Sequence, residues 1–273
     1  MTERYAVIGN PIAHSKSPLI HAEFARQTGK DISYTAVLAT RETFVSVVGD
    51  FIGQGGKGMN VTVPFKEQAW KYLATDIAPR AASARAANTL TFKAGKIIGD
   101  NTDGVGLTAD LERNLQLDLA DKRLLILGAG GAVRGVLGPL LEREVREVVI
   151  ANRTPVKAQQ IAAEFADMGA VSGCAFSELR GPAYDLIING TSASLQGEMP
   201  LLPAGIVGDT TVCYDMAYGR GHTPFTLWAK SLHAARATKG WGMLVEQAAE
   251  SFLLWRGIRP NTQPALEALS HHS

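Results

Sequence analysis

The sequence predicts an α/β protein of two domains, one of them built on a doubly wound parallel sheet. From Arg123 onward, short apolar segments alternate regularly with amphipathic ones, which is the pattern of parallel strands joined by helices. The end of the chain contains only helical sequence, at 244–256 and 262–269. Because such helices must bury their apolar sides elsewhere, we expect them to pack on the first half. The predicted domains are a discontinuous one, residues 1–102 plus 243–273, and a Rossmann-like one, residues 103–242.

The first half of the chain mixes strands with helices. Ser17 stands before Pro18, which predicts an N-cap followed by proline at the first helical position. Pro64 is likewise expected near the start of a helix whose first turn contains Lys66. The apolar patterns predict, in chain order, a strand at 5–8, a helix around 20–25, a strand at 33–38, a helix at 44–52, a strand at 58–63, and a hairpin of 88–92 and 96–98 about Ala94-Gly95.

The second half repeats strand and helix. Thr154 before Pro155 predicts another N-cap with proline at the first helical position. The regular alternation favours a single parallel sheet. The patterns predict strands at 124–127, 147–151, 170–176, 184–189 and 211–215, and helices from 103 to 115, from 132, from 155, around 161–168 and at 224–233.

Composition limits the kinds of partner. The 273 residues are 46% hydrophobic with a formal net charge of +1, so bulk electrostatics favour neither nucleic acid nor membrane, and the substrate should be small. No apolar run is long enough to span a bilayer and no signal peptide opens the chain, so we expect a cytoplasmic protein. Cys174 and Cys213 lie far apart in apolar surroundings, which predicts reduced, buried thiols, with neither disulfide nor structural metal. The oligomeric state, a homodimer included, is left open.

A glycine-rich turn, Gly128-Ala-Gly-Gly-Ala132, follows the first strand of the second domain. Glycines at 128 and 130 remove the Cβ atoms that would keep a pyrophosphate away from the start of the next helix. Val133 stands where a third glycine is usual, so Gly131 and Ala132 are expected to provide the close packing of helix on strand. The stretch predicts a dinucleotide site, although glycine-rich turns without a ligand are also common.

The end of the next strand indicates which dinucleotide is bound. An NAD-binding protein places a carboxylate there to hold the ribose hydroxyls, whereas this chain has Asn152-Arg-Thr154. The guanidinium of Arg153 can hold a 2′-phosphate through two charge-assisted hydrogen bonds, with Thr154 and Lys157 adding a donor and a charge. We therefore expect NADP. The alternative is an exposed arginine before a helix that Thr154 caps.

Two further segments carry candidate chemistry. Ser15, Lys16 and Ser17 place two hydroxyls and a cation at a helix start, which could receive a carboxylate; alternatively, Ser17 is only a cap. Lys66, also at a helix start, is a candidate acid–base group, although exposed lysines are common in that position. Asp103, considered alone, is better explained as the cap of the following helix.

Several segments of the chain form a recognisable set when they are taken together and in order. They are Gly9-Asn-Pro-Ile-Ala-His-Ser-Lys-Ser-Pro18, Asn60-Val-Thr-Val-Pro-Phe-Lys66, Ala87-Asn-Thr-Leu90, Gly99-Asp-Asn-Thr-Asp-Gly104, Gly128-Ala-Gly-Gly-Ala132, Asn152-Arg-Thr154 and Tyr214-Asp-Met-Ala-Tyr218. The segments span nearly the full chain, and the set is far more specific than any one of them. It resembles that of the shikimate dehydrogenase family, whose members reduce 3-dehydroshikimate with NADPH.

The resemblance implies a discontinuous N-terminal substrate domain, an NADP-binding Rossmann-like domain and an active site between them. It implies that Lys66 is the acid–base residue, with Asp103 beside it. The substrate carboxylate would be bound by Ser15 and Ser17, and the ring and its hydroxyls would be surrounded by Thr62, Lys66, Asn88, Asp103, Tyr218 and Gln247. The implied cofactor contacts are Gly128, Ala129, Gly130, Gly131, Ala132, Asn152, Arg153, Thr154, Pro155, Val156, Lys157, Met216 and Gly240.

The chemistry of these residues agrees with that assignment. Hydride delivered to a ketone carbon leaves charge on its oxygen, so an ammonium at Lys66 could supply the proton while Asp103 orients the lysine and a neighbouring substrate hydroxyl. One departure is the stretch Asp76-Ile-Ala-Pro79, where the family often has Glu-Leu-Thr-Glu, so a polar contact at Ala78 is absent. Two alternatives remain: a quinate/shikimate dehydrogenase of broader specificity, and a protein that binds NADP or a cyclic acid without turnover.

Overall fold

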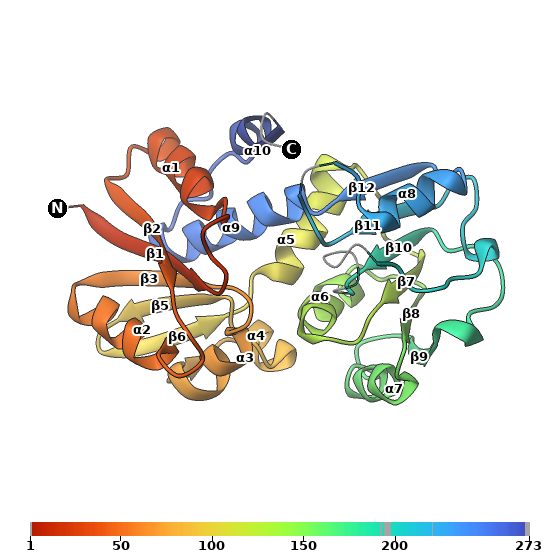
Figure 1. Ribbon diagram of the computed structural model, residues 1–273, viewed down its shortest axis with the longest axis horizontal. Coiled ribbons are helices and arrows are strands. Elements are labelled where there is room, and N and C mark those ends of the chain that lie inside the picture. Colours follow the sequence, from red (N-terminus) through yellow and green to blue (C-terminus); the bar gives the residue numbers. More distant parts are fainter. Residues whose placement is uncertain (1, 192, 194–197, 220, 271–273) are drawn as a thin grey trace. The chain divides into compact units, whose positions relative to one another are not determined.

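The computed structural model describes residues 2–191, 193, 198–219 and 221–270 (Figure 1). The chain divides into two compact units, a first one containing the residues up to Gly106 and those from Leu244, and a second one of Leu107–Met243. Both boundaries fall inside helices, α5 (Asp103–Ala109) and α9 (Trp241–Arg256). No turn or linker therefore marks either boundary in the sequence.

The first unit contains a mixed six-stranded sheet in the order β2-β1-β3-β5-β6-β4 (Figure 1). β1 runs parallel to β2 and β3, while β5 is antiparallel to both of its neighbours. β4 has only two residues and was not predicted, since so short a segment shows no periodicity. The strands are β1 (Glu3–Gly9), β2 (Ile32–Leu38), β3 (Gly56–Val61), β4 (Asp76–Ile77), β5 (Thr89–Lys93) and β6 (Lys96–Asp100).

The helices of the first unit bury their apolar faces on this sheet. Phe44 and Phe65 stack in one core, with ring centroids 4.7 Å apart. The terminal helices pack on this unit as expected: Phe252 of α9 meets Phe24 of α1 edge to face, and Trp255 stacks on Tyr5. The helices are α1 (Ser17–Thr28), α2 (Phe44–Gly53), α3 (Lys66–Gln68), which continues as a π-helical turn (Ala69–Leu73), α4 (Pro79–Ala84), α9 and α10 (Gln263–Ser270).

Two local predictions in this unit have opposite outcomes. The hairpin of β5 and β6 is confirmed: Ala94 and Gly95 both have positive φ, as a two-residue turn between right-twisted strands requires. The prediction that Ser17 caps α1 is wrong, because the cap residue is Lys16 and Ser17 already lies inside the helix. The Oγ of Ser15 accepts the hydrogen bond of the Ser17 backbone N–H at 3.3 Å, so the neighbouring serine contacts the helix start.

The second unit contains a parallel six-stranded sheet in the order β12-β11-β10-β7-β8-β9, the arrangement of a Rossmann domain (Figure 1). β12 was not predicted, because Arg236-Ala-Thr-Lys239 lies at the sheet edge and has no apolar run. The strands are β7 (Arg123–Leu127), β8 (Glu147–Asn152), β9 (Val171–Ala175), β10 (Leu186–Asn189), β11 (Val212–Asp215) and β12 (Arg236–Lys239).

Helices cover both faces of this sheet. Leu124 and Ile126 of β7 face one apolar cluster, and the alternate residues Leu125 and Leu127 face another. Two predicted helices are shorter than expected: α5 gives way to a π-helical turn (Asp110–Asn114), and α7 ends at Glu164, before Met168. The helices of this unit, besides the second half of α5, are α6 (Gly131–Leu141), α7 (Pro155–Glu164) and α8 (Pro224–Ser231).

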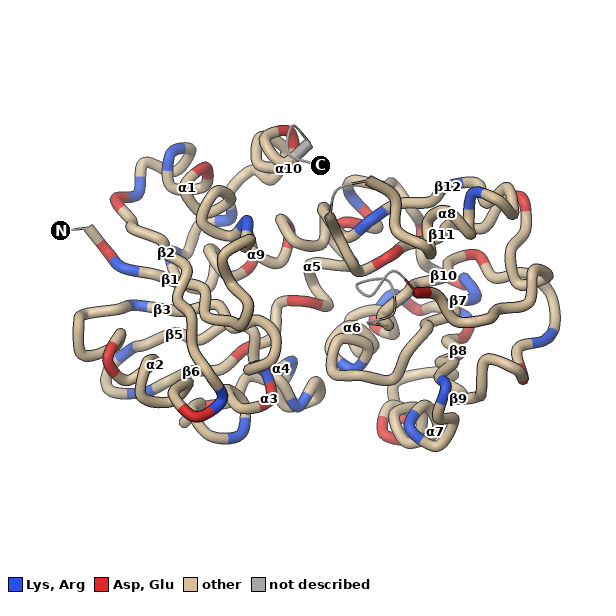
Figure 2. Tube along the Cα trace, viewed as in Figure 1, with Lys and Arg blue, Asp and Glu red and all other residues tan. Residues whose placement is uncertain are grey.

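Charged side chains are distributed without strong bias. In each unit, Lys and Arg are interspersed with Asp and Glu along the trace (Figure 2). None of the helices in the described part of the chain combines the length and apolar character that crossing a bilayer requires.

Candidate active site

An ion pair between Lys66 and Asp103 is the centre of the candidate site. Lys66 begins α3, just beyond the end of β3, and its Nζ donates to Oδ2 of Asp103 at 2.6 Å. The Lys66 side chain is 29% exposed and that of Asp103 only 9%, so the lysine is the more accessible partner of the pair. The expected helix start at Lys66 is confirmed, but Pro64 is not its first residue, because Phe65 is the N-cap and Pro64 precedes it.

Asn88 holds the other oxygen of the Asp103 carboxylate. Its Nδ2 donates to Oδ1 of Asp103 at 2.8 Å, and its Oδ1 accepts the backbone N–H of Thr102 at the same distance. Asn88 is buried directly before β5, and Asp103 is buried at the start of α5. A buried carboxylate is tolerated only when it is paired and hydrogen-bonded, and both oxygens meet that condition.

Gln247 joins this group from α9. Its Oε1 lies 3.3 Å from Nδ2 of Asn88 and 3.4 Å from Oγ1 of Thr102. Thr102 is fully buried, and its Oγ1 also accepts a hydrogen bond from Nδ2 of Asn88 at 2.9 Å. The sequence did not single out Thr102, because a threonine inside an acidic turn has no pattern that distinguishes it from a surface residue.

Ser15, Ser17 and Thr62 belong to the same unit. Thr62 follows β3, and its backbone N–H donates to Ile8 at the end of the neighbouring strand β1. The segments that contain Ser15 and Lys66 thus both leave the sheet at the carboxyl ends of the parallel strands β1 and β3. Ligands of parallel sheets commonly bind at these ends. Among the described residues, no hydrogen bond joins Ser15, Ser17 or Thr62 to Lys66. Tyr218 belongs to the second unit, where it is 43% exposed and packs on Trp241.

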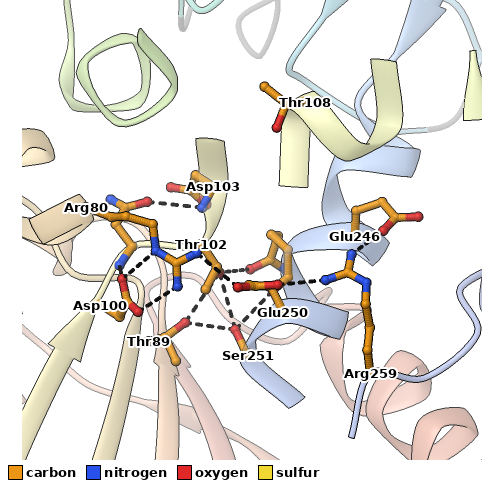
Figure 3. Close-up of polar contacts among 12 residues, drawn as sticks. Arg80, Thr89, Asp100, Thr102, Asp103, Thr108, Glu246, Glu250, Ser251 and Arg259 are labelled. Carbon is orange, nitrogen blue, oxygen red and sulfur yellow. Dashed lines mark hydrogen bonds and ion pairs between the residues drawn. The ribbon is translucent and has the colours of Figure 1, made fainter. Parts of the chain in front are cut away.

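A buried polar group behind these residues was also missed. Asn60 of β3 donates to Ser251 of α9 at 2.9 Å and accepts the hydroxyl of Tyr34 at 2.7 Å. Ser251 lies 2.8 Å from the hydroxyl of Thr89 and 3.3 Å from that of Thr102 (Figure 3). Burial raises the pKa of Tyr34 well above its ordinary value, so its hydroxyl remains a donor. These partners are distant in sequence, and no local pattern connects them.

In the second unit, the glycine turn after β7 has the form that a dinucleotide needs. Gly128 has a φ of +106°, which favours glycine, and a Cβ there would lie 3.1 Å from the carbonyl oxygen of Gly190. The turn itself therefore requires glycine at this position. Gly130 is exposed, and a Cβ on it would meet open space. It is the N-cap of α6, where no side chain satisfies the first N–H groups.

The packing of α6 on the sheet differs from the prediction. Gly131 and Ala132 are exposed, so neither provides the close contact. Val133 is fully buried instead, and a Cβ on Gly190 would come within 2.7 Å of its Cγ2. The glycine that permits the close approach thus lies across the contact, directly after β10.

The end of β8 has the residue types that the sequence analysis expects for a 2′-phosphate. Arg153 is exposed there, and the stretch 152–157 contains no carboxylate. Thr154 is the N-cap of α7, as predicted, but its side chain makes no capping hydrogen bond, so its hydroxyl is available to a ligand. Asn152 donates to the Thr154 carbonyl at 3.0 Å and shapes this turn. Pro155 begins α7, and Val156 and Lys157 are exposed in its first turn.

Met216 and Gly240 meet at the ends of β11 and β12. A Cβ on Gly240 would lie 2.5 Å from the carbonyl oxygen of Met216, so only glycine fits. The Met216 N–H donates to Asn189 at the end of β10, and the Gly240 N–H donates to Ala217. The predicted cofactor residues after β7, β8, β11 and β12 thus all lie at the carboxyl edge of one parallel sheet, where such domains bind dinucleotides.

The first unit has a lysine–aspartate pair among amides and hydroxyls, and the second is a Rossmann unit with an arginine directly after its second strand. Together these features define a class of protein. This class is the two-domain nicotinamide-dependent dehydrogenases. Comparison with known proteins is more specific, and the chain belongs to the shikimate dehydrogenase family. Three family models match it: the shikimate dehydrogenase substrate binding domain at 7–90, shikimate / quinate 5-dehydrogenase at 110–197, and the shikimate 5'-dehydrogenase C-terminal domain at 240–269.

Individual relatives match almost end to end. The chain is 56% identical to the shikimate dehydrogenase (NADP(+)) of Nitrosospira multiformis over 98% of each chain. The solved structure of an Ael1 enzyme from Pseudomonas putida has a TM-score of 0.93 at 45% identity, covering 98% of each chain. The shikimate 5-dehydrogenase of Thermus thermophilus, solved with NADP(H) and shikimate, has a TM-score of 0.88 at 31% identity and covers both chains completely.

Proposed function

We propose that the protein catalyses the reversible NADPH-dependent reduction of 3-dehydroshikimate to shikimate, a step of aromatic amino-acid biosynthesis. The observation that carries this proposal is the Lys66–Asp103 pair, held at 2.6 Å with the lysine side chain partly exposed. Family membership supports the same reaction, because the curated relatives are NADP(+)-dependent shikimate dehydrogenases. The protein is thus an oxidoreductase that acts on a CH–OH group.

At the reacting end of the substrate, Lys66 acts as the acid–base group. In the direction of reduction, its ammonium gives a proton to the ketone oxygen as negative charge develops there; in oxidation, the amine takes the hydroxyl proton back. Asp103 keeps the ammonium in place and accepts a hydrogen bond from the neighbouring substrate hydroxyl. Asn88 fixes the carboxylate of Asp103, and Gln247 offers a further amide to the ring hydroxyls. When bound, NADPH supplies the hydride.

Ser15 and Ser17 bind the substrate carboxylate in this proposal. Ser17 is the first residue of α1, and its backbone N–H already points to Oγ of Ser15. No side chain caps α1 from Lys16, so the start of the helix presents N–H groups and a positive dipole end to an anion. Thr62 and Tyr218 contact the ring side of the substrate in the same proposal.

NADP is held by the carboxyl edge of the parallel sheet. The uncapped start of α6, at Gly130 to Ala132, takes the pyrophosphate, and Ala129 and Gly128 form the turn that precedes it. Arg153, Thr154 and Lys157 take the 2′-phosphate, beside Asn152, Pro155 and Val156. Met216 and Gly240 line the cofactor site at the ends of β11 and β12.

The test is turnover of four substrate and cofactor combinations: shikimate or quinate with NADP⁺ or NAD⁺. We expect shikimate with NADP⁺ to have the highest kcat/KM, and NADPH oxidation in the presence of 3-dehydroshikimate. Higher kcat/KM with quinate or with NAD⁺ would favour the broader quinate/shikimate dehydrogenase, whose family model also matches 110–197. Binding of NADP⁺ and shikimate without any hydride transfer would make the protein a non-catalytic binder.

We also propose the cytoplasm as the compartment of this reaction. Cys174 and Cys213 are both free; Cys213 is buried as expected, but Cys174 is only partly buried. Reduced thiols persist in compartments where glutathione and thioredoxin are kept reduced. Fractionation of cells that express a tagged form of the chain tests this proposal.

A further inference from the structure

A chain of charged side chains lies behind the candidate site in the first unit (Figure 3). Arg80 of α4 holds Asp100, the last residue of β6, through two hydrogen bonds: Nε to Oδ1 at 3.0 Å and Nη2 to Oδ2 at 2.7 Å. The remaining guanidinium nitrogen, Nη1, donates to Oε1 of Glu250 on α9 at 3.0 Å. One planar group therefore joins three elements that are distant in sequence.

From Asp100 the contacts continue to Asp103. Oδ1 of Asp100 accepts the backbone N–H of Asn101 at 2.7 Å, and Oδ1 of Asn101 accepts the backbone N–H of Asp103 at 3.1 Å. The Asn101 amide also donates to the carbonyl of Ala86. Asp100, Asn101 and Asp103 are all buried. The position of the Asp103 backbone is thus set by hydrogen bonds that begin at Arg80.

From Glu250 the contacts continue along α9. Oε2 of Glu250 accepts a hydrogen bond from Nη1 of Arg259 at 2.7 Å, and Nη2 of Arg259 donates to Oε2 of Glu246 at 2.7 Å (Figure 3). Glu246 and Glu250 flank Gln247 on the same helix, one turn apart. The ion pairs therefore hold the part of α9 that presents Gln247 to Asn88.

The Arg80 contacts differ from an ordinary surface ion pair. The side chains of Arg80, Asp100 and Glu250 are 30%, 11% and 14% exposed. Burial by itself would lower the pKa of Arg80, but the hydrogen bonds and charges of Asp100 and Glu250 outweigh it and raise that pKa above its usual range. A planar guanidinium with two oxygens of one carboxylate and a third acceptor also fixes orientation, which a lysine does not do.

We infer that Arg80 is a positioning residue for the reaction: it sets where Asp103 stands relative to Lys66 and, through Glu250, where Gln247 stands. It touches neither of these groups itself. The inference rests on the proposed function for its catalytic meaning, but the placement of the Lys66–Asp103 pair can also be measured without substrate.

The test uses three variants of the full chain and one matched control. Arg80→Met keeps the aliphatic stem and removes the guanidinium, and Arg80→Lys restores the charge alone. Glu250→Gln leaves the Arg80–Asp100 contacts in place and weakens the contacts of Glu250 with Arg80 and Arg259. The control is Arg146→Met, because Arg146 also holds an aspartate through two hydrogen bonds, with Asp121, but on the exposed surface of the second unit.

We expect Arg80→Met to lower kcat roughly 10- to 100-fold, since misplacement of a catalytic group by about 1 Å has effects of that size. KM for shikimate should rise less than kcat falls, because the carboxylate contacts at Ser15 and Ser17 remain, and the Kd of NADP⁺ should change less than about threefold, because the whole second unit is untouched. Arg80→Lys should recover part of the loss, Glu250→Gln should lose less than Arg80→Met, and Arg146→Met should match the parent.

A second measurement is independent of turnover. An amine-specific reagent labels Lys66 at a rate that reflects how firmly Asp103 holds its ammonium, and peptide mass spectrometry reports that rate. Arg80→Met should label faster at Lys66, with unchanged labelling at exposed Lys157. The inference is overturned if folded Arg80→Met, with a cooperative melting transition, keeps the parental kcat and labelling rate. An inactive parent chain would overturn the proposed function instead, and the labelling comparison would still decide the role of Arg80.

Discussion

Lys66 and Asp103 are 37 positions apart, yet the Nζ of one lies 2.6 Å from a carboxylate oxygen of the other. Each follows a strand of the first sheet: Lys66 comes after β3 and Asp103 after β6. The hairpin of β5 and β6 brings these ends together, since β5 pairs with both β3 and β6. The acid–base pair is therefore a product of sheet topology.

Replacement of Lys66 by alanine should lower kcat by about 100- to 10,000-fold, the usual contribution of a positioned proton donor. KM for shikimate should rise much less, because the carboxylate contacts at Ser15 and Ser17 remain. Steady-state kinetics with NADP⁺ measures both constants. The matched control is Lys71→Ala, an exposed lysine of the following helical turn. An unchanged kcat in Lys66→Ala would remove its role as acid–base group.

Arg153→Ala should weaken NADP⁺ about 10- to 100-fold, since a hydrogen bond to a charged group contributes roughly 1.5–3 kcal/mol. NAD⁺ has no 2′-phosphate, so its affinity should change little. Titration of both cofactors against the purified variant measures the two effects. Arg146→Ala, another exposed arginine of the same unit, serves as the control. Equal losses for the two cofactors would contradict a phosphate clamp at Arg153.

The parts of the fold that the sequence predicted have strong local patterns. Buried strands such as β7 are continuous apolar runs, and the Ala94-Gly95 turn contains a glycine, the residue that adopts positive φ most readily. The edge strand β12 was missed, because Arg236-Ala-Thr-Lys239 pairs on only one side and needs no apolar run. The boundaries between the units are also invisible locally, since both fall within helices.

The site was predictable where a residue type is unusual for its place, as with Arg153 at the end of β8. The roles of Asn60, Thr102 and Arg80 depend on partners from other elements, so no local pattern reveals them. Gly190 is the clearest case. The missing third glycine of the turn indicated a need for close packing, but only the structure shows that Gly190 meets it from the neighbouring strand.

Gly190→Ala should therefore destabilise the protein by about 1–3 kcal/mol, the usual cost of overpacking, because its Cβ would lie 2.7 Å from Cγ2 of Val133. Val133→Ala alone should also destabilise, through the cavity it leaves. The double variant should be more stable than the sum of the two losses predicts, by about 1 kcal/mol or more. Urea unfolding of the four proteins measures this coupling. Strict additivity would mean that the two positions do not share the contact.

Ala78→Ser should stabilise the protein by about 0.5–1 kcal/mol. Ala78 is the N-cap of α4, with extended backbone angles and Pro79 next to it, and it has no side chain that could accept a hydrogen bond from the helix start. Serine would supply that acceptor. Thermal unfolding measures the gain, with Ala78→Val as a control that adds bulk without an acceptor. A gain of the same size in the valine variant would show that capping is not the cause.

His21 should make the protein lose stability as the pH falls below about 6.5. Its ring is fully buried, stacked on Tyr34 at a centroid distance of 4.1 Å and packed near Phe24 and Phe252. Burial lowers the pKa of His21 from 6.5 to about 3, and the nearby Asn60 opposes this only in part. Between those two pH values the unfolded chain binds a proton that the folded protein excludes, so acid favours unfolding.

The expected slope is about 1.4 kcal/mol per pH unit, which accumulates to roughly 4–5 kcal/mol at pH 3. Urea unfolding at a series of pH values measures it. His21→Leu removes the titrating ring, so the difference in stability between this variant and the parent should change with that slope from pH 6.5 downward and stay constant above it. Other acid-titrating groups cancel in the difference. A pH-independent difference for His21→Leu would mean that the ring is solvated or protonated in the folded protein.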